Sequence, residues 1–196
     1  IYFILLILMI ICGLISHFNL IDINLLNILR FERSFINSHE YWRLLSGHLV
    51  HLNMPHTLMN VSAFCLIIII FWKDMSYPAD LLNLLFSIIF INTGLYFWHP
   101  ELTNYAGFSG ILHGLFLYDF LKTLPQNKSG SIAAISLIIL KILWEQSPWG
   151  DTEATDKLIG GSVATMAHLY GGLSGLLAGM CYLFFLKKTK KVANSL

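Results

Sequence analysis

The stretch YAGFSGILHGLF, from Tyr105 to Phe116, places a serine between two glycines at the start of an apolar segment. Ser109 stands between Gly107 and Gly110, and His113 follows one helical turn later. A serine here has two interpretations. It can be a helix N-cap, which is a common role for serine at a helix N-terminus. It can also be a nucleophile, because the free backbone N–H groups and the positive end of the helix dipole beside its hydroxyl would stabilise an oxyanion. The rest of the chain decides between them.

The composition predicts a membrane protein. Of 196 residues, 56% are hydrophobic and 12% are charged, whereas soluble domains have about 45–50% and about 25%. A helix needs about 20 residues to cross the hydrocarbon core of a bilayer. Six apolar runs meet or approach that length: Ile1–Ile15, Leu58–Trp72, Leu81–Trp98, Gly107–Leu121, Ile132–Trp144 and Gly160–Leu186. We therefore expect one all-α membrane domain, residues 1–196, with six transmembrane helices.

Lysines gather at one end of the predicted helices. They are Lys73, Lys122, Lys128 and the run Lys187–Lys191. Because lysine and arginine are enriched in cytoplasmic loops, both termini are predicted to be cytoplasmic, with a basic tail over residues 187–196. The long first loop, about residues 16–52, is then external. Three arginines in that loop run against this rule: Arg30, Arg33 and Arg43.

Polar side chains inside predicted spans are costly in lipid, so they are candidates for function. His56 and Asn60 are four residues apart at the start of the second run and share one helix face. His48 and His51 come shortly before them. Taken alone, this group is equally consistent with hydrogen bonds between helices.

Glycines predict which helices pack most closely. Gly110 and Gly114 form a G-x-x-x-G face on the fourth run. The sixth run carries a second stripe: His168, Gly171, Gly175 and Gly179. Small residues let helix backbones approach each other in a membrane. We expect these two faces to meet and to bring His168 beside Ser109.

These residues supply the parts of a serine hydrolase. His168 would accept the proton of Ser109, and the Ser109 N–H with the side chains of His56 and Asn60 would hold the oxyanion. No aspartate or glutamate is evidently placed to orient His168, so a Ser-His dyad is predicted. His113 is a rival base, because it shares the helix face of Ser109 and helical side chains lean toward the N-terminus. Otherwise it is a packing partner of His168.

An ordered set of short motifs runs along the chain. It comprises Trp42-Arg43, then His51, His56 and Asn60, then GFSG (Gly107–Gly110), and then AHLYG (Ala167–Gly171) followed by Gly175. In this order the chain resembles the rhomboid family of intramembrane serine proteases over nearly its whole length. The resemblance implies a six-helix rhomboid-like bundle with Ser109 as nucleophile and His168 as general base. His56, Asn60 and the Ser109 N–H would form the oxyanion hole, and no metal or cofactor is implied.

One departure indicates a branch of that family. His113 stands where many rhomboids carry a tyrosine, four residues after the serine. With GFSGILHG and KILWEQ (Lys141–Gln146), it makes the chain more similar to the rhombosortase branch, whose members are inferred to process Gly-Gly C-terminal sorting tails of exported bacterial proteins. The resemblance then implies a bacterial inner (cytoplasmic) membrane protein whose site opens to the periplasm. Its partners would be the lipid bilayer and a transmembrane substrate entering laterally, with no nucleic acid.

Glu145 and Trp144 lie near the outer end of the fifth run. Lys141 is one helical turn from Glu145, which favours a salt bridge on one helix face. Alternatively, Glu145 helps to recognise the substrate or orients a donor near the site. Trp144 is typical of an interfacial anchor, and in rhomboids this helix borders the route of the substrate.

Two other classes of protein compete with the protease. A catalytically inactive rhomboid-like protein would bind membrane clients, but such relatives usually lack the serine or the histidine. A metal-binding membrane protein would use the histidines, since neutral imidazole is a common ligand. It would leave the Gly-Ser-Gly sequence unexplained. The sequence therefore favours the protease.

Overall fold

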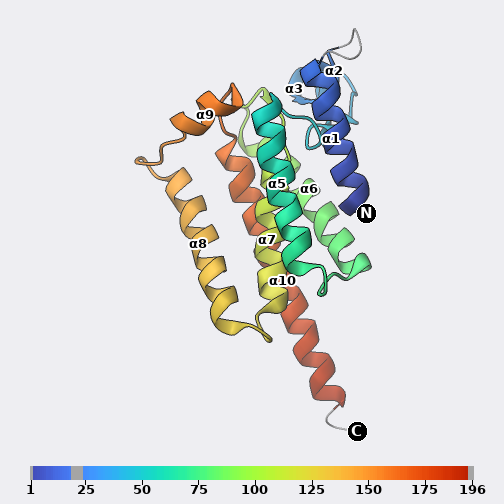
Figure 1. The fold of residues 1–196 in the computed structure, drawn as a ribbon, viewed down its shortest axis with the longest axis vertical. Helices are drawn as coiled ribbons and strands as arrows, with labels where there is room; N and C mark the ends of the chain where they lie inside the picture. The colour runs from blue at the N-terminus through green and yellow to red at the C-terminus, as the bar shows by residue number, and fades with distance from the viewer. Residues whose placement is uncertain (1, 19–23, 194–196) are drawn as a thin grey trace.

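The structure, a computed structural model, describes residues 2–18 and 24–193, and over these ranges it is mostly helical (Figure 1). The helices are α1 (Tyr2–Phe18), α2 (Leu25–Leu29), α3 (Arg33–Asn37), α4 (Arg43–Ser46), α5 (Met54–Phe71), α6 (Tyr77–Trp98), α7 (Ser109–Thr123), α8 (Lys128–Gln146), α9 (Glu153–Ile159) and α10 (Thr165–Ala193). The strands are β1 (Phe31–Glu32) and β2 (Asn104–Tyr105). Residue 1 of the predicted first run, residues 19–23 of the predicted first loop and residues 194–196 of the predicted tail lie outside these ranges.

The long helices carry the signature of a membrane protein. Within the described ranges, four helices are long and apolar enough to cross a bilayer, namely α5, α6, α8 and α10, and α1 contains a shorter apolar helix. Large apolar side chains are exposed on them, among them Phe3, Ile69, Leu82, Leu137 and Phe184. Extended apolar surfaces of this kind are matched to lipid rather than to water. The chain is an integral membrane protein.

α7 is the predicted fourth run, and it has only 15 residues. It contacts α5, α6, α8 and α10 and lies among them in Figure 1. Lys122, which follows the predicted fourth run and was therefore expected between the fourth and fifth runs, is instead buried in the last turn of α7 and pairs with Asp80 of α6 at 2.8 Å. Since both charges are withdrawn from water, loss of either partner alone would leave an uncompensated buried charge.

The predicted glycine contact between the fourth and sixth runs is confirmed. A Cβ added to Gly110 would lie 2.8 Å from the Ala167 carbonyl oxygen, and one added to Gly114 would lie 2.8 Å from that of Gly171. In the reverse direction, Cβ atoms on Gly171 and Gly175 would collide with the carbonyls of Gly110 and Gly114. The two backbones therefore touch, and the first turn of α7 is set against the first turn of α10.

The last predicted run is longer than expected. It was predicted to end at Leu186, but α10 continues to Ala193, so the basic run Lys187–Lys191 is helical. In Figure 1 this end of α10 projects beyond the other helices, away from α9. The basic tail is therefore, over its described part, a continuation of the helix that carries His168.

α2 and α3, which belong to the predicted first loop, lie at the same end of the bundle as α9 (Figure 1). β1 pairs antiparallel with β2, and Phe31 lies opposite Tyr105, so the loop is joined to the segment that leads into α7. Arg33 donates to the carbonyl oxygens of Tyr96 at 2.8 Å and Leu95 at 2.9 Å, at the C-terminal end of α6. It satisfies acceptors that a helix end leaves free.

Arg43 and Arg30 are also engaged by the fold. Arg43 is buried, with its Nε donating to Glu40 at 2.6 Å and its Nη1 donating to the Asn27 carbonyl at 2.8 Å. Arg30 pairs with Glu32 at 2.8 Å. All three arginines of the predicted first loop therefore make contacts within the fold. These contacts account for arginines in a loop that was predicted to be external, where lysine and arginine are less common.

Candidate active site

The turn before α7 depends on a glycine. Gly107 has φ of +127°, a conformation that side chains rarely adopt, and a Cβ there would lie 2.9 Å from the His56 ring. The Gly107 N–H donates to the Gly47 carbonyl at 3.0 Å, and the Gly107 carbonyl accepts from the Tyr105 hydroxyl. The segment before α7 is thus fixed to the first loop, and Ser109 begins the helix.

Ser109 and His168 are brought together as the glycine spacing predicts. Ser109 Oγ lies 2.9 Å from His168 Nε2, within hydrogen-bond distance, although 59 residues separate them. His168 is 5% exposed. As the first residue of α7, Ser109 also presents one of the backbone N–H groups that a helix leaves without an intrahelical partner. The Ser109 hydroxyl, the His168 imidazole and the Ser109 backbone N–H therefore lie close together at the start of α7.

A carboxylate completes this chain of contacts, which the sequence did not indicate. Glu145, in the last turn of α8, places Oε2 2.8 Å from His168 Nδ1. The expectation that no acidic residue orients His168 is therefore wrong. The salt bridge predicted for Glu145 is confirmed, because its Oε1 lies 2.7 Å from Lys141 Nζ. One carboxylate thus bonds the lysine with one oxygen and the histidine with the other.

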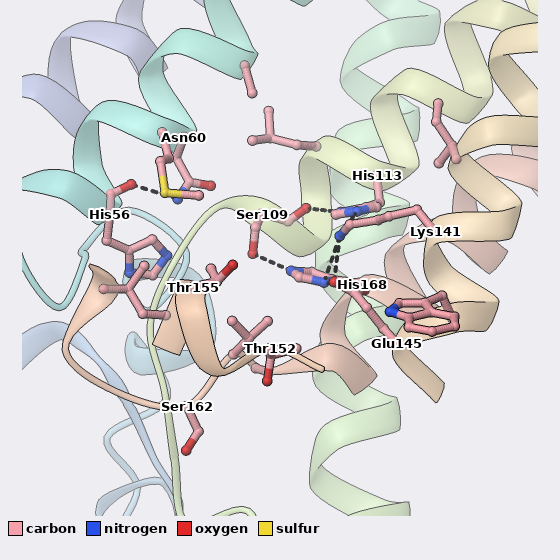
Figure 2. A pocket seen from close by; sticks show the side chains of 18 of the residues that line it. His56, Asn60, Ser109, His113, Lys141, Glu145, Thr152, Thr155, Ser162 and His168 are labelled. Atoms are coloured by element: carbon pink, nitrogen blue, oxygen red, sulfur yellow. Dashed lines mark hydrogen bonds and ion pairs between the residues drawn. The ribbon is translucent and has the colours of Figure 1, made fainter. Parts of the chain in front are cut away.

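His113 lies against His168 instead of bonding the serine hydroxyl. The two rings stack with their centroids 4.2 Å apart. His113 Nδ1 donates to the Ser109 carbonyl at 2.7 Å, and its Nε2 accepts from Lys141 Nζ at 2.8 Å (Figure 2). Both ring nitrogens are thereby engaged away from Ser109 Oγ, which favours His168 over His113 as the base.

His56 and Asn60 project from the first turns of α5 toward the same space as Ser109 (Figure 2). His56 Nδ1 accepts from the Leu52 N–H at 3.4 Å, so the hydrogen of the neutral ring lies on Nε2, which is then a donor. Asn60 Nδ2 donates one hydrogen to the His56 carbonyl at 2.9 Å and retains a second. His51 packs edge-on against His56, with ring centroids 4.9 Å apart.

These groups line one cavity of about 600 Å³. Its polar wall consists of Ser109, His168, His113, Lys141, Glu145, His56 and Asn60. Its apolar wall includes Met59, Leu112, Phe116, Leu137 and Ile138, and Trp144 also lines it. The cavity is also lined by four polar residues from α9 and the segments next to it, namely Asp151, Thr152, Thr155 and Ser162. The cavity thus combines an apolar wall with a polar wall that carries the contact between Ser109 and His168.

Comparison with known families gives a clear result. A family model described as Rhomboid domain matches residues 38–185, which is most of the chain and includes every residue of the Ser109, His168 and Glu145 contacts. The chain belongs to the rhomboid family. A comparison with curated proteins found no match. Rhomboids are intramembrane serine proteases that act on membrane proteins within the bilayer, and the predicted family is thus confirmed.

In this rhomboid domain, two histidines lie buried between α4 and α5, outside the membrane-spanning helices. Burial lowers the pKa of His48 to about 4 and that of His51 to about 3. Neither ring nitrogen of His51 has a hydrogen-bond partner among the described residues. Both imidazoles are therefore neutral in the folded protein at neutral pH.

This burial predicts a loss of stability in mild acid. Below pH 6.5 the unfolded chain protonates both histidines while the folded chain does not, so the stabilisation is complete above pH 6.5 and is lost as the pH falls toward 4. Thermal unfolding in detergent should therefore show a midpoint that drops between pH 7 and pH 4.5. His51→Phe, which puts an apolar aromatic ring in its place and loses no hydrogen bond, should reduce this dependence and leave the part due to His48. Ser76→Ala, which removes no titratable group, should leave it as steep as in the wild type.

Proposed function

We propose that the chain is an active intramembrane serine endopeptidase that cleaves a peptide bond in or near a transmembrane segment of its substrate. The observation that carries the proposal is the 2.9 Å contact between Ser109 Oγ and His168 Nε2 inside the cavity. Ser109 attacks the scissile carbonyl and His168 accepts its proton. His168 then protonates the leaving amine, and water hydrolyses the acyl-enzyme.

The oxyanion would be held by three donors. These are the Ser109 N–H, His56 Nε2 and the second hydrogen of Asn60 Nδ2. The positive end of the α7 dipole adds to them, because Ser109 opens that helix. Donors fixed before the reaction, where water is excluded, are worth more than the same groups in water. Gly107, Gly110 and His51 support this arrangement through the turn, the helix contact and packing against His56.

Glu145 acts in this proposal as a positioning residue. By accepting from His168 Nδ1–H, it holds the tautomer whose Nε2 lone pair faces Ser109, and its charge stabilises the imidazolium that forms. The mechanism then uses a Ser-His-Glu triad in place of the dyad that the sequence suggested. The salt bridge with Lys141 fixes the carboxylate in turn.

Glu145→Gln is expected to lower kcat by about a hundredfold, within the range of acid–base contributions, with a smaller change in KM. The amide keeps the size of the side chain but loses the charge that stabilises the imidazolium. Steady-state cleavage and the labelling rate of Ser109 by a fluorophosphonate would both report this. Lys141→Met, which breaks the salt bridge and retains the carboxylate, should cost less. An equal loss in both variants would contradict a specific role for Glu145.

We propose that the substrate is the Gly-Gly C-terminal sorting tail of exported bacterial proteins. This proposal rests on His113 and on the sequences GFSGILHG and KILWEQ, which make the chain similar to the rhombosortase branch. A helical substrate must unwind before its carbonyl is accessible, and glycine disfavours a helix by about 1 kcal/mol relative to alanine. Six helices, α1, α5, α6, α7, α8 and α10, would cross the bacterial inner membrane with both termini cytoplasmic. The cavity end near α9 would then open to the periplasm.

The test is cleavage of a synthetic substrate in reconstituted vesicles: a Gly-Gly segment, an apolar span and a basic end. Wild type should cleave at the glycines, as read by mass spectrometry, and Ser109→Ala should show no product. Ser76→Ala is the matched control, because the Ser76 side chain makes no capping bond at the start of α6. Cleavage by Ser109→Ala would refute the mechanism. If the wild type binds this substrate without cleaving it, the chain is a client-binding relative instead.

A further inference from the structure

A lysine ammonium lies among three atoms that are all of metal-ligand type. Lys141 Nζ is 2.8 Å from His113 Nε2, 2.7 Å from Glu145 Oε1 and 3.3 Å from His168 Nδ1 (Figure 2). His168 Nδ1 carries the hydrogen donated to Glu145, so the last distance is a close approach rather than a second bond. The ammonium thus marks a position where this fold already stabilises a cation.

The surrounding atoms have the spacing that a small metal ion needs. One ring nitrogen of His113, one of His168 and one oxygen of Glu145 all lie within 4.8 Å of one another. Zn²⁺ binds imidazole nitrogen at about 2.0–2.1 Å and carboxylate oxygen at about 2.0–2.2 Å, with four ligands in a tetrahedron. To bind one ion, the His113 and His168 rings must turn out of the stack in which their centroids lie 4.2 Å apart, so that both lone pairs converge. Water would take the fourth position. Two imidazoles and one carboxylate suit zinc, whereas Mg²⁺ and Ca²⁺ prefer oxygen ligands.

His113 already has the tautomer of a metal ligand. Its Nδ1–H donates to the Ser109 carbonyl at 2.7 Å, which leaves the Nε2 lone pair directed at Lys141. Ligating histidines commonly donate their other N–H to a backbone carbonyl, because this fixes the ring and raises its basicity. No change of tautomer is required of His113.

Lys141 is able to leave. Its side chain is 46% exposed, compared with 10% for Glu145, and it lines the cavity of about 600 Å³. A long lysine side chain readily moves its charged end to water or to the membrane interface. A metal ion that enters the cavity therefore competes with a flexible group.

We propose that this position is a zinc site, at which Zn²⁺ binds His113, His168 and Glu145 in place of Lys141 and reversibly switches the protease off. The site itself stands on the geometry, and the switch rests on the proposed function. When the metal takes the Nδ1 lone pair of His168, the ring hydrogen moves to Nε2 and no proton is released. Nε2 then has no lone pair for the Ser109 proton. Glu145 is also diverted to the metal.

Binding is tested directly with Co²⁺, whose visible absorption reports tetrahedral coordination, and with Zn²⁺ as competitor, on purified protein in detergent. His113→Phe keeps the stacked ring and removes one ligand, so zinc affinity should fall at least about tenfold. Lys141→Met removes the competing ammonium, so affinity should rise. His39→Asn, the matched control, should bind as the wild type does. Equal affinity in wild type, His113→Phe and Lys141→Met would overturn the site.

The switch is tested by fluorophosphonate labelling of Ser109, which needs no substrate. Zn²⁺ should block labelling, EDTA should restore it, and Mg²⁺ or Ca²⁺ should leave it unchanged. Labelling of each protein is expressed as a fraction of its own rate without zinc. On that scale, the zinc concentration that halves labelling should be at least about tenfold higher for His113→Phe than for the wild type. Zinc binding with undiminished labelling would overturn the switch. A third outcome separates the two proposals. If Ser109 is never labelled, but metal affinity falls in His113→Phe and rises in Lys141→Met, the zinc site stands and the proposed protease fails.

Discussion

Protein carrying His168→Ala is expected to cleave its substrate about ten-thousandfold more slowly than the wild type, or below detection. His168 is the group whose nitrogen lies 2.9 Å from Ser109 Oγ, and without it nothing takes the proton of the nucleophile. Loss of the nucleophile or base of a serine protease costs several orders of magnitude in kcat, because these residues act as one unit. Single-turnover cleavage in reconstituted vesicles would measure the loss.

His113→Phe provides the contrast. Phenylalanine preserves the ring that stacks on His168 at 4.2 Å but has no nitrogen for Ser109 or Lys141. We expect this variant to be far more active than His168→Ala, although slower than the wild type. A dead His113→Phe beside a working His168→Ala would make His113 the base. Thermal unfolding of both variants would show whether either loss comes from misfolding.

Gly171→Ala is expected to cause the second large effect, this time on stability. Its Cβ would collide with the carbonyl of Gly110, and both partners are backbone, so α7 and α10 must separate. Overpacking of this kind costs about 1–3 kcal/mol, occasionally more. The midpoint of thermal unfolding in detergent should fall clearly. Activity should fall as well, because the same contact sets the distance from Ser109 to His168.

Gly172→Ala is the control for that substitution. It lies on the next position of α10, and its Cβ would meet the end of the Ile142 side chain, which can change rotamer. A Cβ there should cost much less than one at Gly171. Equal destabilisation by the two alanines would mean that general loss of glycine, rather than the backbone contact, sets the stability.

The parts of the site that sequence reasoning found are those with a local signal. Apolar runs identify the helices, and glycines four residues apart identify the faces that touch, so the contact between Ser109 and His168 follows from two patterns on two segments. The positive φ of Gly107 explains why glycine stands at that position, because other residues rarely adopt it. His56 and Asn60 share a face because they are four residues apart.

The contacts that were missed depend on how distant segments lean toward each other. The sequence placed Glu145 near the site as one alternative, but Lys141 one turn earlier already accounted for its charge, and no local pattern indicated that its second oxygen reaches His168. The pairing of Lys122 with Asp80 spans 42 residues. Arg33 reaches the end of α6 across more than 60 residues, and no periodicity within one segment encodes such a contact.

The position of α8 has a consequence for the timing of the reaction. Of its residues only Ser131 and Ile142 are buried, and it lies at the edge of the bundle in Figure 1. The same helix carries the carboxylate that faces His168. If the substrate enters from the lipid beside α8, as the resemblance to rhomboids implies, a tilt of α8 that admits it would also withdraw Glu145 from His168. On that route, admission of the substrate and its cleavage would be successive states, and a peptide would be cut only after α8 had returned over it. Glycine, which adds no side chain beneath the returning helix, passes that second selection most easily.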